Sequence, residues 1–153
     1  MTDPKHATFS YYFENRRNRL VIPVQLYSYP FNPMLTVSAN ALWDTGAMMS
    51  AIIPEIRDKL KAITIYRKTI AAIHTTQDVD VVSITLELPN RVVKKIIEVA
   101  VCNMASNAEM IIGMDIISLG DFALSNGNDQ TLFSFVVPPF CEKIDFSKKQ
   151  NDP

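Results

Sequence analysis

Short apolar segments separated by turn residues run through most of the sequence. Segments with the composition of β-strands are residues 8–13, 19–27, 35–43, 64–73, 79–88, 92–102, 122–124 and 131–137. A short polar turn separates 8–13 from 19–27, which predicts a hairpin, and 64–73 with 79–88 is predicted to form a second strand pair. In 79–88, alternation places one apolar face toward a core, made of Val82, Ile84, Leu86 and Leu88. The pattern predicts a barrel-like, mostly β domain.

Helical patterning is confined to two short segments. In residues 54–60, Pro54 suits the first turn of a helix, and Ile56 and Leu60 share one face. In residues 116–119, Asp115 is placed to cap the helix at its start. We therefore expect one or two short helices beside the strands.

Composition places the chain among ordinary globular proteins. Of its 153 residues, 48% are apolar and 20% are charged, and the net charge is −1. These values predict a single domain over residues 1–140 with a polar tail at 141–153, and they do not indicate a nucleic-acid partner. No apolar run has the form of a signal peptide or the length of a membrane span, so we expect a cytoplasmic protein without a membrane partner.

Cysteine and histidine spacing does not indicate a metal site. Cys102 and Cys141 lie far apart in the chain, and two reduced thiols are favoured, although a disulfide stays open. No grouping of Cys, His and carboxylates has metal-ligand spacing, and no glycine-rich phosphate loop occurs. The expected function therefore needs no metal and no cofactor.

The strongest chemical signal is Asp44-Thr45-Gly46-Ala47, which directly follows an apolar segment. A carboxylate at the end of a strand, followed by small residues, is presented on a tight loop where a second carboxylate could meet it. The chain has four glycines, so Gly46 and Gly113 are expected to mark places where a side chain does not fit. A plain polar turn, with Asp44 bonded to nearby backbone, is the alternative interpretation of this segment.

Two motifs in order carry a resemblance to a known family. The segment Ala41-Leu42-Trp43-Asp44-Thr45-Gly46-Ala47 is followed by Ile111-Ile112-Gly113-Met114-Asp115, with Gly113 69 residues after Asp44. This arrangement resembles the retropepsin-type aspartic proteases, the single-lobe dimeric relatives of pepsin. The resemblance covers about residues 20–137 and implies a closed β-barrel lobe with one or two short helices.

The resemblance also implies a dimer, because the chain has one Asp-Thr-Gly and the chemistry needs two carboxylates. A homodimer would place Asp44 of each copy at one water molecule. Thr45 would bond the opposing loop, Gly46 would let backbone approach the carboxylate, and Ala47 would keep the loop small beside the substrate. The segment around Gly113 would pack under this loop, with Asp115 as a helix cap or a partner of a basic group.

The family's β-hairpin flap corresponds to residues 70–77, which lack the usual glycines. Its expected substrate-binding residues are Ala71, Ala72, Ile73 and His74, although His74 also fits a solvent-exposed loop. The leading hypothesis is a homodimeric aspartic endopeptidase acting on peptide or protein substrates. The alternative is a catalytically silent dimer of the same fold that binds a peptide or partner strand.

Overall fold

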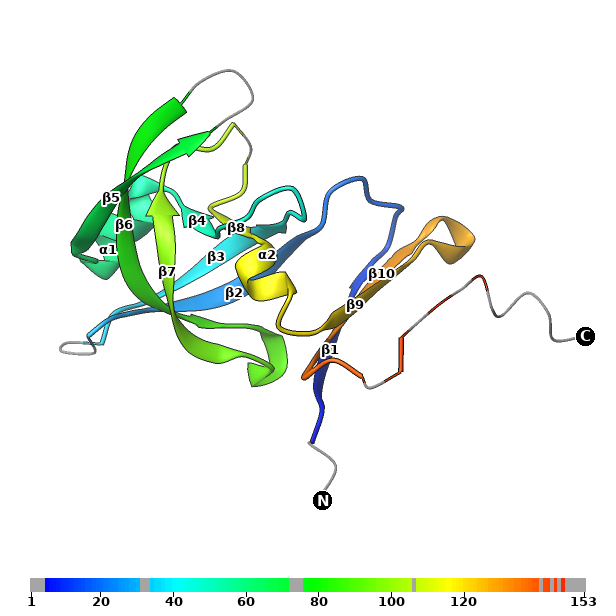
Figure 1. Ribbon diagram of the computed structural model, residues 1–153. Coiled ribbons are helices and arrows are strands. Elements are labelled where there is room, and N and C mark those ends of the chain that lie inside the picture. The colour runs from blue at the N-terminus through cyan, green and yellow to red at the C-terminus, as the bar shows by residue number, and fades with distance from the viewer. Residues whose placement is uncertain are drawn as a thin grey trace, which may run out of the picture.

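Ten β-strands and two short α-helices make up most of the described chain (Figure 1). The computed structural model describes residues 5–30, 34–71, 76–105 and 107–140, together with 142, 143, 145 and 147. The strands are β1 Ala7–Phe13, β2 Val21–Ser28, β3 Thr36–Trp43, β4 Ala51–Ile52, β5 Thr64–Ala71, β6 Thr76–Glu87, β7 Lys94–Val101, β8 Met110–Ile112, β9 Asp121–Ser125 and β10 Thr131–Val137. The helices are α1 Pro54–Leu60 and α2 Met114–Ile117, and the 3₁₀ turns are η1 Pro89–Arg91 and η2 Gly127–Asp129.

Six strands close into a barrel. They follow the order β2-β3-β8-β4-β7-β6, and β6 pairs back onto β2 to complete the circuit, while β5 adds to the outside of β6. The β3–β8 and β4–β7 pairs are parallel and the others are antiparallel. Side chains that fill the barrel without solvent exposure include Ile22, Leu26, Ile84, Leu86 and Met110. The mostly β, closed-barrel fold with short helices is therefore confirmed.

The predicted hairpin between residues 8–13 and 19–27 is wrong. β1 instead pairs antiparallel with β10, with Phe9 opposite Phe135, and β10 pairs with β9 to complete a separate three-stranded sheet. Phe9, Phe133 and Phe135 are buried, and their rings lie 4.7–6.1 Å from one another or from the Trp43 ring. β1 and β10 both present aromatic side chains on one face. The free energy gained by burying these side chains together exceeds what the local turn would contribute by pairing β1 with β2.

Two other local predictions, the first helix and the second strand pair, are confirmed. Pro54 occupies the first turn of α1, and Ile56 and Leu60 are its buried residues. β5 and β6 form an antiparallel hairpin, and Val82 lies in the core as predicted.

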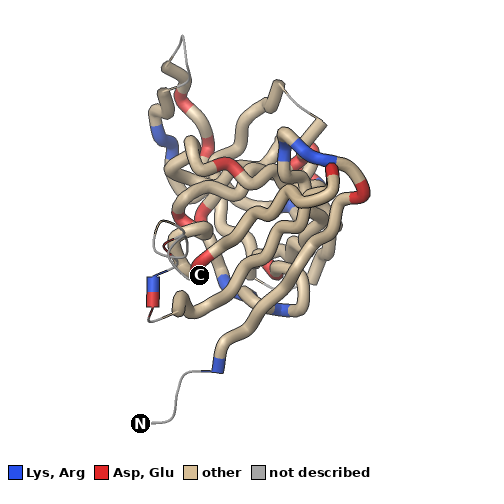
Figure 2. Tube along the Cα trace, turned by 90° about the vertical axis from the view of Figure 1, so that its right-hand side faces the viewer, with Lys and Arg blue, Asp and Glu red and all other residues tan. Residues whose placement is uncertain are grey.

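Charged residues of both signs are interspersed along the chain in Figure 2, in line with the net charge of −1. Asp80 accepts from Arg57 and Arg67, and Glu87 pairs with Lys94 and Arg91. Among the described residues, no helix is long and apolar enough to cross a membrane.

Candidate active site

The two motifs lie side by side at one end of the barrel. β3 and β8 run parallel with Trp43 opposite Ile112, so Asp44 and Gly113 follow directly at neighbouring strand ends. The backbone N–H of Asp44 donates to the carbonyl of Ile112 at 3.0 Å, which continues the ladder into the loop. Trp43 is only 7% exposed and anchors the strand in the aromatic core. The strand end that carries Asp44 is therefore fixed by buried structure.

The loop orients the Asp44 carboxylate. The N–H of Gly46 donates to Oδ1 of Asp44 at 2.8 Å, and the N–H of Ala47 donates to the Asp44 carbonyl at 3.2 Å. A Cβ at position 46 would lie 3.1 Å from Asp44 Oδ1, so a side chain there would crowd the carboxylate. Asp44 is half-buried, whereas Thr45 and Gly46 are exposed. One carboxylate is thus held at the surface with neighbours that a second molecule can reach.

Gly113 supports this loop from below. A Cβ at position 113 would lie 2.8 Å from the Ala47 carbonyl oxygen and 2.9 Å from the Met49 carbonyl carbon. Such distances leave no room for a side chain, because both contacts are backbone atoms. The next residue completes the contact, since the N–H of Met114 donates to the Ala47 carbonyl at 2.8 Å. The expectation that the Gly113 segment packs against the Asp44 loop is consistent with these contacts.

Asp115 does not cap α2. Gly113 is the N-cap residue and makes no side-chain cap bond, while Asp115 lies in the first turn. Its two carboxylate oxygens accept from Ser50, Oδ1 from the hydroxyl at 2.8 Å and Oδ2 from the N–H at 3.0 Å. One backbone N–H and one hydroxyl, both from Ser50, thus bind the carboxylate, and no side chain caps α2.

Ser50 is a residue of the site that sequence reasoning missed. It is fully buried, and besides donating to Asp115 its hydroxyl accepts from the N–H of Gly113 at 3.1 Å. The hydroxyl therefore joins the end of the Asp44 loop to the start of α2. Nothing in the local sequence distinguishes this serine, because both of its partners are more than sixty residues away.

A small apolar cluster links the loop to the β5–β6 hairpin. Buried Ala51, Val79 and Ala100 form its centre, and partly buried side chains packed on it are Met49, Ile70, Cys102, Met104 and Ile111. Met49 comes from the Asp44 loop, whereas Ile70 and Val79 come from the hairpin stem. Cys102 is a free thiol, and burial raises its pKa above the ordinary value of 9.0. The β5–β6 hairpin and the Asp44 loop therefore pack against the same apolar cluster.

The predicted flap is only partly within the described structure. Ala71 is exposed at the end of β5, where it pairs with Thr76 of β6. Ala72, Ile73 and His74 lie outside the described residues. The stem near this end is tied by the Thr69 hydroxyl, which donates to Asp78 Oδ1 at 2.6 Å. No group of three His, Cys, Asp or Glu side chains in the described ranges is placed to hold a metal ion.

Comparison with known proteins adds a fold neighbour. No protein-family model matches the sequence, and no curated protein matches it. A retropepsin-like aspartic protease from Rickettsia conorii is similar in structure, with a TM-score of 0.51 at 14% identity over 90% of this chain and 98% of that one. The EIAV protease, solved with the inhibitor HBY-793, matches with a TM-score of 0.44 at 23% identity, over 68% of this chain and 89% of that one. The simian foamy virus protease matches with a TM-score of 0.40 at 18% identity, over 63% of this chain and 92% of that one. Together with the closed barrel and the paired strand ends, the match to the Rickettsia protein shows that this chain has the retropepsin-like fold.

Proposed function

We propose that the chain is a homodimeric aspartic endopeptidase whose active site contains Asp44 from each copy. The observation that carries the proposal is the position of Asp44 at the end of barrel strand β3 in a retropepsin-like fold, with its carboxylate held by the Gly46 N–H at 2.8 Å. The sequence has one Asp-Thr-Gly, so a single copy supplies half of a carboxylate pair. A symmetric dimer supplies the other half.

The chemistry follows from two carboxylates that share one proton. Two carboxyl groups close enough to share one water molecule do not both ionise readily, so one Asp44 is ionised and the other is protonated. The ionised carboxylate takes a proton from a water molecule, whose oxygen forms a bond to the scissile carbonyl carbon. The protonated carboxylate hydrogen-bonds and protonates the carbonyl oxygen. The tetrahedral gem-diol then collapses and the C–N bond breaks. The carboxyl that took the proton from water passes it to the leaving nitrogen, and one hydroxyl of the gem-diol returns its proton to the other carboxylate, so the pair again shares one proton.

The neighbouring residues take roles consistent with their positions. Gly46 orients the carboxylate through its N–H, and the small side chain of Ala47 leaves room for the substrate beside the loop. Thr45 is exposed and available to bond the opposing loop. The hairpin residues Ala71, Ala72, Ile73 and His74 are proposed to contact the peptide. The proposed substrate is an extended peptide segment. The cytoplasm is the compartment in which we expect it to be cleaved.

The test compares wild type with Asp44→Asn on a diverse peptide pool from pH 4 to 7.5, with products identified by mass spectrometry. Asp129→Asn is the matched control, because Asp129 lies in the exposed η2 turn. The proposal expects cleavage with a bell-shaped pH dependence that Asp44→Asn abolishes and Asp129→Asn leaves intact. Cleavage that persists in Asp44→Asn contradicts the proposal, and a stable dimer without cleavage points instead to a peptide-binding module.

A further inference from the structure

A groove with two arginines is formed by β1, the segment between β1 and β2, β3 and the residues before β8. Its volume is about 510 Å³, within the range of pockets that bind small ligands. Its polar lining includes Arg17 and Arg19, together with Asn40 of β3 and Asn107. In the part of the chain that the structure describes, neither arginine forms an ion pair. This arginine groove therefore carries two positive charges that no carboxylate of the chain neutralises.

Contacts to buried residues hold Arg17 in place. Its guanidinium carbon lies over the Phe13 ring, 5.6 Å from the centroid, and its backbone N–H donates to the Thr131 hydroxyl at 2.9 Å. Phe13 and Thr131 are both buried, so the core fixes the position of these contacts. A guanidinium that stacks on a ring keeps its N–H edge available for a planar anion such as a carboxylate. Arg17 is therefore positioned to bind a ligand.

Three asparagine side chains add hydrogen-bond donors beside the arginines. Asn18, Asn40 and Asn107 are exposed and line the groove. Among the described residues, the carboxylate of Glu109 contacts this group, but it accepts from the backbone N–H of Asn40 at 2.9 Å and forms no ion pair with either arginine. Guanidinium and amide N–H groups together can surround a bound carboxylate with donors.

Apolar side chains form the rest of the lining. The rings of Tyr11 and Phe13 have centroids 4.9 Å apart, and Val21 and Ala108 contribute smaller apolar groups. A ligand that fills this groove therefore joins a short apolar stem to a negative charge. The side chains of glutamate and aspartate have this form, whereas an inorganic anion has no stem to place against the rings.

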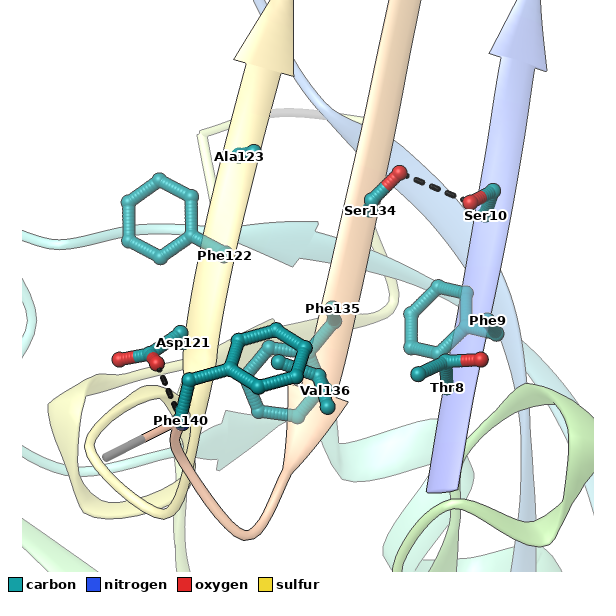
Figure 3. Close-up of a pocket in the computed structure, with 10 residues that line it drawn as sticks. All are labelled: Thr8, Phe9, Ser10, Asp121, Phe122, Ala123, Ser134, Phe135, Val136 and Phe140. Atoms are coloured by element: carbon teal, nitrogen blue, oxygen red, sulfur yellow. Dashed lines mark hydrogen bonds between the residues drawn. The ribbon is translucent and has the colours of Figure 1, made fainter. Parts of the chain in front are cut away.

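Another hollow, on the three-stranded sheet, has the opposite electrostatic character (Figure 3). Ser10 and Ser134 bind each other there at 2.8 Å, and the one charged side chain in its lining is Asp121, which accepts from the Phe140 N–H at 2.8 Å. An acidic ligand would be repelled by Asp121. The net charge of the chain is −1, so the molecule as a whole does not attract anions either. Binding of an acidic ligand would therefore be specific to the arginine groove.

The arginine groove adjoins the strand end that carries Asp44. The N–H of Trp43 donates to the Leu20 carbonyl at 2.9 Å, which ties the segment between β1 and β2 to the residue before Asp44. In Figure 1 this segment lies beside the loop that follows β3. Asn40, in the groove lining, precedes Asp44 by four residues, about 13 Å along an extended chain. A peptide of a few residues can therefore extend from the groove to the Asp44 carboxylate.

We propose that the arginine groove binds acidic side chains of a peptide. Arg17 and Arg19 bind the carboxylate, and the stem of the side chain packs against Tyr11 and Phe13. The inference goes beyond the proposed function, because binding in the groove requires neither cleavage nor a second copy. Under the proposed function, the groove would select substrates that carry glutamate or aspartate a few residues from the bond that is cleaved.

Isothermal titration calorimetry with two unlabelled peptides tests the groove. The probe is acetyl-Gly-Glu-Ala-Glu-Gly-amide, and its neutral counterpart has glutamine in place of both glutamates. Asp44→Asn is the parent protein, so that the proposed activity does not consume the probe. The acidic peptide is expected to bind at least about 10-fold more tightly than the neutral one, and Arg17→Gln or Arg19→Gln should each raise its Kd by about 10-fold, since each removes a charge-assisted contact. Equal affinity for the two peptides overturns the proposal.

Arg16→Gln is the matched control for loss of charge. Arg16 is the neighbour of Arg17, but its guanidinium donates to the Asn126 carbonyl at 3.2 Å and it does not line the groove. Its substitution should change the Kd by less than about 2-fold, because solvent and salt screen a charge outside the groove. Arg17→Lys keeps the charge without the planar fork and is expected to weaken binding nearly as much as Arg17→Gln. Equal losses in Arg16→Gln and Arg17→Gln, with unchanged circular dichroism spectra, overturn the proposal.

The outcomes separate this inference from the proposed function. Binding of the acidic peptide that depends on Arg17, in a protein without Asp44-dependent cleavage, supports the groove and rejects the protease. Asp44-dependent cleavage that is unaffected by acidic residues in the peptide and by Arg17→Gln supports the protease and rejects the groove. Displacement of the acidic peptide by an equal concentration of inorganic phosphate overturns the assignment to a peptide side chain, because phosphate has no stem.

Discussion

The substitution Gly113→Ala tests whether the Gly113 segment holds the Asp44 loop in place. Gly113 has φ −93° and ψ −174°, an extended conformation that alanine adopts without strain. The obstacle is instead the space for one methyl group. Its Cβ would lie 2.8 Å from the Ala47 carbonyl oxygen and 2.9 Å from the Met49 carbonyl carbon, and both atoms belong to the backbone that follows Asp44.

Two opposing terms set the size of the effect. Replacing glycine lowers the entropy of the unfolded chain, which stabilises the protein by about 0.4–1 kcal/mol where the conformation is compatible. Forcing a methyl group into a packed site costs about 1–3 kcal/mol. We therefore expect Gly113→Ala to lower the free energy of unfolding by about 1–2 kcal/mol, since the contacts are with backbone that cannot rotate away. A displacement of the Asp44 loop by about 1 Å would also lower the cleavage rate by about 100-fold.

Gly127→Ala is the matched control. Nothing lies within 4 Å of a Cβ at position 127, and the residue has no positive φ. This variant should be neutral or slightly stabilised, by up to about 1 kcal/mol. Both variants are unfolded in urea at one fixed protein concentration, because the proposed dimerisation would make apparent stability concentration-dependent. A Gly113→Ala variant as stable and as active as Gly127→Ala would refute the reasoning.

Three further predictions follow from other contacts. Ser50→Ala should lower the free energy of unfolding by about 2–3 kcal/mol, because it leaves a buried N–H unpaired, whereas exposed Ser38→Ala should change it by less than about 0.5 in the same urea titration. The hydrogen bond from Lys94 lowers the pKa of Glu87 below its ordinary 4.5, so this pair stabilises the fold above about pH 4.5, and the contribution is lost as the pH falls through the lowered pKa. Glu87→Gln should therefore weaken the loss of stability at acid pH, measured as the free energy of unfolding against pH. An unchanged acid side of that curve would contradict this prediction. Cys102 should react with a thiol reagent at pH 7 much more slowly in the native protein than in urea, because burial raises the pKa of its thiol. Cys102→Ser supplies the background rate, and equal rates in the two conditions would show that the thiol is accessible in the native protein.

The fold was predictable from sequence as far as its local signals reached. Alternation located the β6 core face, and Pro54 with its spaced apolar residues located α1. The error was one of pairing: the turn at 14–18 suggested a hairpin, whereas β1 pairs with β10 more than a hundred residues away. Strand composition states that a strand exists, but the choice of partner depends on which distant face buries the aromatic side chains together.

The candidate site divides in the same way. The sequence pointed to the contacts of Asp44, Gly46 and Gly113, because a loop that holds a carboxylate and a close approach of two backbone segments each require particular residue types. Ser50 was not readable, since serine suits many surface positions and its burial appears only once β4 and α2 are packed. The role of Asp115 failed for a related reason: the cap rule considers the helix alone, and a hydroxyl from another segment took the carboxylate.

Contacts within one copy already hold the Asp44 loop, which bears on what a second copy would have to supply under the proposed function. The Ile112 carbonyl, the Gly46 N–H and the Met114 N–H fix the loop in a single copy. A second copy therefore needs to supply a carboxylate and need not fold the loop, so little of the association free energy is spent on ordering it.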